Sequence, residues 1–390
     1  MKACGCNAEL KRVVLDRIAE KGRITFAEYM DMALYYPELG YYTSPERKIG
    51  KEGDFYTSPC VHPIFGAMIA EQLHEMWEVM ARPDGFTIAE FGAGTGFLAF
   101  DIMSTIRPFW PELFEAVRYV IVEASRHLVA RQQEQMAALA LPSGKVEWAQ
   151  GIPRGMVGCV MSNELVDALP VHRVRHCASR ESRVGSRPGG EGLREIYVAA
   201  DGDRLVEVLD EPATPEIVAY LDRLGVRLAE EQEAEVGLAA LSWLREVAEA
   251  LRRGFVLTID YGYEAEELYG PRFPKGTLVG YRHHQVVTNA YEAIGRQDLT
   301  AHVNFSVLMR WGEELGLDTT GFTNQMRFLL ALGIAEKAAA GRDAGSTEAI
   351  RRRLAARQLF MPGGMGEVFK VLIQHKGLER PQLRGLSAPW

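Results

Sequence analysis

The chain has 390 residues, of which 47% are hydrophobic and 25% are charged, and its formal net charge is −8. These values are typical of a globular protein with one large domain or two interleaved domains. The negative charge argues against general nucleic-acid binding, which needs a basic face, and the lack of any long apolar run argues against a transmembrane helix.

The N-terminal residues have neither the apolar core of a signal peptide nor the Arg/Ser-rich character of a transit peptide, so we expect a cytoplasmic location. The five cysteines are scattered, as is usual in a reducing compartment. Cys4 and Cys6 form a lone Cys-x-Cys motif without a second pair at metal-binding spacing. We therefore predict no metal site.

Two helices are predicted near the N-terminus. Helical spacing of apolar residues indicates a helix over 9–21, and Thr25 can cap a second helix that Pro37 stops. Tyrosines surround the Pro/Gly turn that follows, and we interpret them as packing beneath it: Tyr35, Tyr36, Tyr41 and Tyr42.

The segment 51–66 is polar and rich in turn residues, and it precedes a predicted helix over 64–80. In one interpretation it is a surface connection in which Thr57 or Ser58 caps that helix. In the other it is a lid over a ligand, which it contacts through Asp54, Thr57 and Ser58. Residue types alone do not separate these alternatives.

The stretch 86–101 is the most informative part of the chain. An apolar β-favouring run leads into Gly92, Gly94 and Gly96, and apolar residues then recur with a helical period. Glycines allow a positive φ and a close approach of backbone N–H groups to a ligand at the helix N-terminus. This strand, loop and helix are typical of the first unit of a nucleotide-binding α/β sheet.

Further strands are predicted at 117–123, 145–148, 155–161, 254–262, 276–284 and 367–374. Helices between several of them indicate an α/β fold with a doubly wound, mostly parallel sheet that binds ligands at the carboxyl ends of its strands. Glu123 ends the second strand, where a carboxylate can accept both hydrogen bonds of a ribose diol.

Between residues 171 and 210 the pattern changes to the alternation of antiparallel strands, which indicates an insertion. We predict a helical stretch over 215–253 and interpret its acidic run, 230–235, as a solvated face. Helices are also expected after a cap at Asn304 and near 324–333 and 347–359, and residues from about 378 are expected to form a loose tail.

Glu90 indicates the class of cofactor. A carboxylate two residues before the first glycine would repel a pyrophosphate, whereas it suits the cationic amino-acid part and the sulfonium of S-adenosylmethionine. Together with Glu123 and Asn163, which follow the second and fourth strands, it favours a methyltransferase over a dinucleotide enzyme. The chain has no P-loop motif, which argues against an NTPase of that class.

The loop after the fourth strand faces the methyl group in such a fold. Here it contains Asn163, Glu164 and Asp167, and paired carboxylates suit a guanidinium acceptor. In the alternative interpretation, Glu164 and Asp167 lie in the first turn of a helix, where acidic residues favour the dipole. The histidines lack metal-binding spacing and are interpreted as loop residues, with His284 and His302 worth testing as neighbours of the site.

Several motifs together resemble the MidA family of S-adenosylmethionine-dependent methyltransferases. They span most of the chain: Gly53–Pro59, Phe65-Gly66, Glu90–Gly96, Asn163–Pro170, Asp260–Gly262, Asp298–His302 and Met365–Lys370. The resemblance implies a seven-stranded Rossmann-like methyltransferase sheet. It also places the segment around Asp54, Phe55 and Thr57 in the active site and makes Glu164 and Asp167 part of an acidic loop. Mitochondrial members assist assembly of respiratory complex I by symmetric dimethylation of an arginine on one of its subunits.

We therefore predict a cofactor-binding core over 81–170, 254–285 and 365–376. It is combined with a helical and lid region over 1–80, inserted substrate-side segments over 171–253 and 286–362, and a tail over 377–390. Cys60 and the loop 286–295 depart from the family pattern, and the N-terminus indicates a bacterial member.

The leading hypothesis is a protein arginine methyltransferase that acts on a protein substrate, with a complex I subunit as the implied partner. A methyltransferase for small molecules and a cofactor-binding assembly chaperone without turnover remain alternatives. The sequence leaves the acceptor, the number of methyl groups and homodimer formation open.

Overall fold

The computed structural model describes residues 6–46, 57–177, 192–339 and 347–387. Its main sheet has the order β15-β16-β10-β5-β2-β3-β4, and a short strand β14 (Val303–Asn304) adds to β10. The strands are β2 (Phe86–Phe91), β3 (Val117–Val122), β4 (Val146–Ala149), β5 (Met156–Asn163), β10 (Leu251–Tyr263), β15 (Asp318–Asn324) and β16 (Phe369–Lys376). The five strands from β4 to β10 are parallel, whereas β16 and β15 are antiparallel to their neighbours. The predicted seven-stranded, mostly parallel α/β sheet is confirmed.

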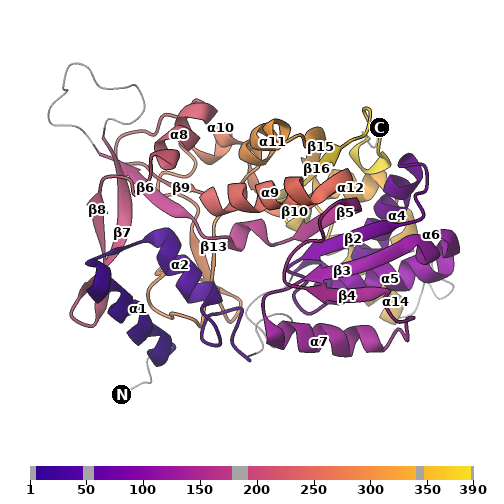
Figure 1. Cartoon of the computed structure of the whole chain (residues 1–390), viewed down its shortest axis with the longest axis horizontal. Coiled ribbons are helices and arrows are strands. Elements are labelled where there is room, and N and C mark those ends of the chain that lie inside the picture. The colour runs from indigo at the N-terminus through magenta and orange to yellow at the C-terminus, as the bar shows by residue number, and fades with distance from the viewer. Residues whose placement is uncertain (1–5, 47–56, 178–191, 340–346, 388–390) are drawn as a thin grey trace.

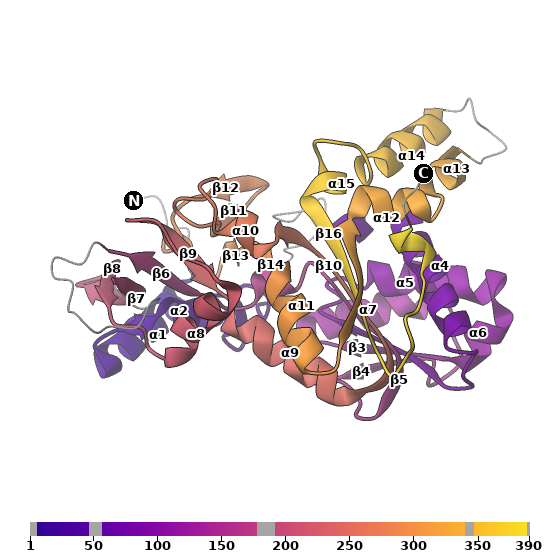
Figure 2. The same ribbon diagram turned by 90° about the horizontal axis from the view of Figure 1, so that it is seen from above.

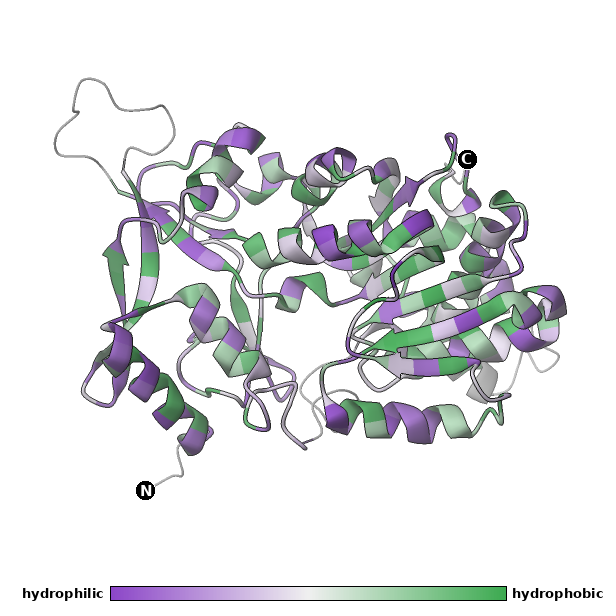
Figure 3. Ribbon diagram, in the orientation of Figure 1, coloured by the Kyte–Doolittle hydropathy of each residue, from purple (hydrophilic) through white to green (hydrophobic). Residues whose placement is uncertain are grey.

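Helices cover both faces of this sheet (Figures 1 and 2). One face packs against α4 (Ile64–Val79), α5 (Phe97–Phe109) and α12 (Gln325–Ala331), and the other against α9 (Leu238–Ala250) and α11 (Phe305–Glu314). Neighbouring strand residues such as Ile88 and Ala89 belong to opposite cores, because side chains alternate along a strand. With both faces buried, β2 and β5 are hydrophobic over most of their length (Figure 3).

The remaining helices of the larger lobe are shorter or lie at its edge. They are α3 (Ser58–Val61), α6 (Pro111–Ala116), α7 (Arg126–Ala137), α13 (Ile334–Ala339), α14 (Thr347–Gln358) and α15 (Met365–Val368).

A smaller lobe lies at the other end of the molecule from α4–α6 (Figure 1). Its sheet has the order β1-β7-β6-β9, with β8 paired to β7, and a second sheet has the order β12-β11-β13. The strands are β1 (Ile24–Thr25), β6 (His172–His176), β7 (Leu193–Asp201), β8 (Arg204–Asp210), β9 (Glu233–Val236), β11 (Val279–Arg282), β12 (Gln285–Val287) and β13 (Asp298–Thr300). The helices are α1 (Ala8–Lys21), α2 (Phe26–Tyr35), α8 (Pro215–Leu224) and α10 (Ala265–Leu268).

Predicted helix caps are present where the sequence placed them. Thr25 Oγ1 accepts from Glu28 N at 3.1 Å, and Asn304 Oδ1 accepts from Val307 N at 3.3 Å. These bonds satisfy N–H groups that a helix start leaves unpaired. Thr57 and Ser58, in contrast, do not cap α4, whose N-cap is Pro63 without a side-chain bond, so that part of the prediction is wrong.

The predicted helical stretch over 215–253 is also wrong in its middle. Gly225, in a left-handed conformation, ends α8, and the second half of the acidic run enters the strand β9. The run is a solvated face only at Glu230 and Glu231, which are exposed, because Glu233 and Glu235 are only 7% and 8% exposed. β9 pairs with the basic strand β6, whose Arg173 and Arg175 lie opposite Glu235 and Glu233. Cross-strand charge pairing therefore stabilises the strand.

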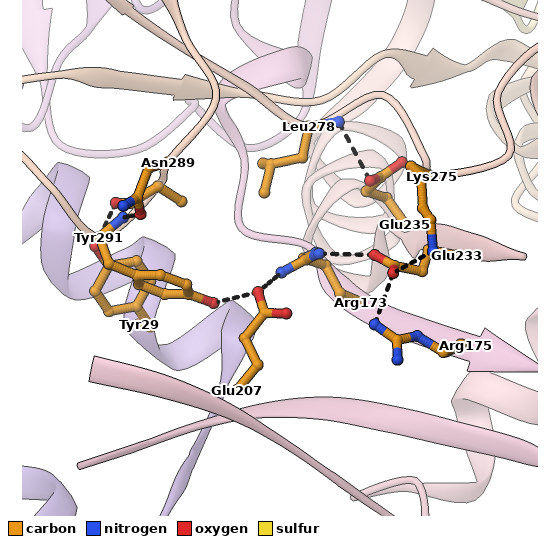
Figure 4. Close-up of polar contacts among 11 residues, drawn as sticks. Tyr29, Arg173, Arg175, Glu207, Glu233, Glu235, Lys275, Leu278, Asn289 and Tyr291 are labelled. Atoms are coloured by element: carbon orange, nitrogen blue, oxygen red, sulfur yellow. Dashed lines mark hydrogen bonds and ion pairs between the residues drawn. The ribbon is translucent and has the colours of Figure 1, made fainter. Parts of the chain in front are cut away.

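The two buried glutamates of β9 have different partners (Figure 4). Glu233 accepts from Arg173 Nη2 at 2.9 Å and from Arg175 Nη2 at 2.7 Å. Glu235 accepts from Thr277 N, Thr277 Oγ1 and Leu278 N at 2.9–3.2 Å, which fixes the segment that leads into β11.

Replacing Glu235 by alanine is expected to lower the free energy of unfolding by about 3 kcal/mol, because it leaves buried N–H donors unpaired. Urea unfolding followed by circular dichroism measures the change. Glu230→Ala is the matched control, since Glu230 is exposed in the same acidic run. Equal stability of the two variants would contradict the structural role of Glu235.

The expected loose tail does not hold for residues up to Ser387. Leu383 is 3% exposed, and η2 (Arg384–Leu386) packs against α4 and α12. Arg384 N donates to both carboxylate oxygens of Glu75 at 3.0 Å. Burial of Leu383 and packing of η2 against two helices thus hold this segment in place, although its sequence shows neither a helical nor a strand period.

Candidate functional site

The glycine loop has the conformation that its sequence predicts. Gly92, Gly94 and Gly96 have φ values of 63°, 54° and 84°, and Gly96 is the N-cap of α5. A Cβ atom on Gly92 would lie 2.7 Å from Leu165 Cδ1. The loop therefore needs glycine both for its backbone and for its close approach to the chain after β5.

A cavity of about 280 Å³ opens beside this loop. It lies at the carboxyl ends of β2, β3 and β5, where the strand order reverses, as expected for ligand sites in open α/β sheets. Its lining includes these predicted site residues: Thr57, Glu90, Gly92, Gly94, Glu123, Asn163 and Glu164. Gly96 and Asp167 are adjacent in the chain to lining residues. Asp54 and Phe55 lie outside the described residues.

Glu90 is buried at the end of β2 and lines the cavity. Tyr119 OH donates to its Oε2 at 2.6 Å. Burial raises the pKa of Glu90 to about 7, against the opposing effect of this hydrogen bond. A cationic ligand would favour the ionised form, so the position fits the predicted role of Glu90, which stays a prediction.

Glu123 directly follows β3 and also lines the cavity. Its carboxylate accepts from Ser125 N at 2.9 Å and from Gln132 Nε2 at 3.1 Å. Gln132, which is fully buried, also donates to Gly94 O at 2.9 Å. Gln132 therefore links Glu123 to the glycine loop, a role that residue types in this stretch do not indicate.

The acidic turn after β5 contains Asn163, Glu164 and Asp167. Glu164 has a φ of 53°, a strained value for a residue with a side chain. Its Oε1 accepts from Asn163 Nδ2 and from Ser58 N, both at 2.9 Å. Asp167 lies in η1 (Val166–Ala168), which is too short to have the dipole that the structural alternative requires.

The bond between Ser58 N and Glu164 bears on the segment before α4. It fastens α3 to the acidic turn, and Thr57, Pro59 and Cys60 line the cavity. The described end of this segment therefore lies at the site, as the second interpretation predicted.

Asp260, at the end of β10, organises the acidic turn. Its Oδ2 accepts from the backbone N–H groups of Leu165, Val166 and Asp167 at 2.9–3.3 Å, and its Oδ1 accepts from Tyr261 N at 2.9 Å. The four bonds occupy the carboxylate, so Asp260 positions the turn. The sequence showed only an acidic residue after a strand.

Three carboxyl groups thus lie close together, of which Asp167 and Asp260 are buried and Glu164 is partly buried. Burial raises the pKa of Glu164 to about 8 and that of Asp167 to about 6. It raises the pKa of Asp260 well above its usual range, and the charges of Asp167 and Glu164 add to this effect. Within the described part of the chain, no ion pair links the three to a basic side chain.

Two buried oxygens of the turn find no hydrogen-bond donor among the described residues: Asn163 Oδ1 and Asp167 Oδ1. An unpaired buried acceptor is costly, so such atoms commonly mark a ligand position. The matching ligand is rich in donors and positively charged. A guanidinium, with five N–H donors and no acceptor, has this chemistry.

All four N-terminal tyrosines pack in or against the core of the smaller lobe, as predicted, and two of them also belong to the site. Tyr35 and Tyr42 line the cavity and stack on each other with ring centroids 5.6 Å apart. Tyr35 OH donates to Ala168 O at 3.0 Å. Their spacing gave no sign of this, because the residues that they contact lie far along the chain.

His302 lies next to the acidic site, with its ring 5.4 Å from the ring of Tyr261. Burial lowers its pKa to about 4, so the ring is neutral at physiological pH. His283 and His284 form the turn between β11 and β12 and do not line the cavity. In the residues that the structure describes, no group of three His, Cys, Asp or Glu side chains could hold a metal ion, and no helix could cross a membrane.

The raised pKa of Glu164 predicts how stability changes with pH. The folded, ligand-free protein keeps a proton that the unfolded chain releases above the ordinary pKa of 4.5. The free energy of unfolding is therefore expected to decrease as the pH rises from about 5 to 8. Urea unfolding at several pH values measures this, and Glu164→Gln should show a shallower decrease. A wild-type slope in that variant would contradict the assignment.

Three comparisons place this geometry among known proteins. Residues 68–323 match the family model described as "Putative S-adenosyl-L-methionine-dependent methyltransferase". A solved structure from Burkholderia thailandensis bound to S-adenosyl-homocysteine is 30% identical, with a TM-score of 0.87, over 98% of this chain and 95% of its own. The human and mouse proteins named protein arginine methyltransferase NDUFAF7, mitochondrial, are each 28% identical over 94% of this chain and 84% and 85% of their own lengths.

Proposed function

The chain belongs to the MidA family of S-adenosyl-L-methionine-dependent methyltransferases, and from this premise we propose that it methylates arginine in a protein. The observation that carries the proposal is the acidic turn beside the cofactor cavity, with unpaired buried acceptors on Asn163 and Asp167. The names of the human and mouse relatives support the same acceptor.

The residues fit the cofactor. A Cβ atom on Gly92 would lie 2.7 Å from Leu165 Cδ1, so the leucine would have to shift, and Glu90 and Glu123 both line the cavity. We assign binding of the cofactor to these residues together with Gly94, Gly96 and Thr57. When bound, S-adenosyl-L-methionine supplies the methyl group from its sulfonium.

We assign binding of the acceptor to the acidic turn. Glu164 and Asp167 hold the guanidinium as an ion pair, and Asn163 accepts one of its N–H groups. The carboxylates orient one nitrogen toward the cofactor cavity, which supplies proximity and alignment. After the nitrogen–methyl bond has formed, Glu164 is placed to accept the proton that the guanidinium loses. Because Glu164 lines the cavity and has a pKa raised to about 8, it is a suitable base near neutral pH.

The protein that carries the arginine is proposed to be a subunit of respiratory complex I, as the family resemblance implies. A pull-down of labelled, methylated protein from a bacterial membrane extract tests this finer proposal. Methylation confined to unrelated proteins would contradict it without affecting the arginine assignment.

Transfer of a radiolabelled methyl group in a bacterial lysate tests the acceptor class. The expected result is label in the protein fraction that acid hydrolysis releases as methylated arginine. Label only in the small-molecule fraction would contradict the proposal and favour the alternative of a small-molecule methyltransferase. No incorporation, combined with complementation by a Glu164→Gln variant in cells, would favour the chaperone.

A further inference from the structure

A fourth carboxylate lies beside the acidic turn but comes from a different element. Asp298, the first residue of β13, is 3% exposed. Ala301 N donates to Asp167 O at 2.9 Å, which fastens the end of β13 to η1. Tyr42 OH donates to Asp298 Oδ1 at 2.8 Å. Asp298 is thus held between the acidic turn and the tyrosine pair at the cavity.

The charge of Asp298 contributes to the raised pKa values of several groups in the site. Burial is the main cause of the raised pKa of Glu164, and the charges of Asp167 and Asp298 raise it further. The pKa values of Tyr35 and Tyr42 are likewise raised by burial and then by Asp298. These groups therefore share one weakly solvated region, although they come from three separate parts of the chain.

Aromatic rings complete this region. Tyr281 lies directly opposite Asp298 in the pairing of β11 with β13, so both side chains project from the same face of that sheet. Tyr35 and Tyr42 stack nearby. Carboxylates combined with aromatic faces bind planar cations through ion pairs and cation–π contacts.

We propose that Asp298 is an acceptor-binding residue, which Tyr42 holds in position to contact the guanidinium on an edge that Glu164 and Asp167 do not reach. This inference rests on the proposed function. A guanidinium presents N–H donors on all of its edges, so carboxylates from two elements can bind it at the same time. Such a site would distinguish an arginine side chain from a neutral side chain of the same shape.

Binding of a pair of small probes tests the role of Asp298. N-acetyl-arginine amide carries the guanidinium, and N-acetyl-citrulline amide has a neutral urea of nearly the same shape. With the full-length protein saturated with S-adenosyl-homocysteine, we expect NMR titration to show tighter binding of the arginine probe. In Asp298→Asn, the Kd of the arginine probe should rise about 10-fold or more, as for loss of a charge-assisted hydrogen bond. The Kd values of the citrulline probe and of S-adenosyl-homocysteine should stay within about twofold.

Asp318→Asn is the matched control, because the Asp318 side chain is 69% exposed on β15. An arginine preference that persists in Asp298→Asn would overturn the role of Asp298 alone. If the wild type does not prefer the arginine probe, the proposed function fails with it.

Tyr42→Phe provides a second, independent test of the role of Asp298. It is the decisive test if Asp298→Asn does not bind S-adenosyl-homocysteine. It keeps the ring and removes the hydrogen bond that the Tyr42 hydroxyl donates to Asp298 Oδ1. We expect a smaller but measurable loss of affinity for the arginine probe. Unchanged affinity would overturn the inference.

Discussion

Replacing Glu164 by glutamine is expected to lower the rate of methyl transfer by about 10²–10³, the range found when one electrostatic group that stabilises a transition state is removed. The amide keeps the size of the side chain and can still accept from Ser58 N. It loses the negative charge that holds the guanidinium and the capacity to take up its proton. Steady-state kinetics with labelled cofactor measure the rate, and calorimetry measures cofactor affinity, which should not change.

Replacing Glu123 by glutamine should have the opposite effect, on cofactor binding and not on the transfer rate. Glu123 lines the same cavity at the end of β3, where its predicted partner is the cofactor ribose. The substitution should weaken cofactor binding by about 10-fold, because charge-assisted hydrogen bonds are lost. Its transfer rate at saturating cofactor should remain near the wild-type value. If Glu164→Gln leaves both transfer and cofactor affinity unchanged, its assigned role is wrong.

Replacing Gly92 by valine is expected to abolish cofactor binding, with a loss of affinity of at least about 100-fold. Both the positive φ and the contact with Leu165 must change, and strained conformations cost roughly 1–3 kcal/mol each. The sheet should persist, because the loop lies at its carboxyl end. Isothermal titration with S-adenosyl-homocysteine and circular dichroism separate loss of binding from loss of fold.

Gly85→Ala is the control for this substitution. Gly85 directly precedes β2, has no positive φ, and a Cβ atom there would meet no atom within 4 Å. Its cofactor affinity should match the wild type. Retained affinity in Gly92→Val would show that the loop does not form the cofactor cradle.

Local patterns were sufficient to predict the core of the fold. The period-two and helical patterns give the strands and helices from β2 to β5, and the glycine spacing gives the loop between β2 and α5. The carboxylates Glu90, Glu123 and Glu164 each lie at or just after the end of a predicted strand, so their meeting at one edge of the sheet follows from parallel topology.

Interactions between distant segments could not be predicted in this way. Asp260 binds backbone groups 93–95 residues earlier, and Tyr42 binds Asp298 across 256 residues. The acidic run was misinterpreted for the same reason, because the arginines that pair with Glu233 lie 58 and 60 residues away on β6. Only the strand register brings these groups together.

Tandem mass spectrometry of proteins incubated with the purified protein and S-adenosyl-L-methionine carrying an isotopically labelled methyl group tests the central claim most directly. We expect labelled methyl groups on arginine side chains with the wild type and their loss with Glu164→Gln. Labelled methyl groups only on other residue types, or equal labelling of arginine by both proteins, would contradict it.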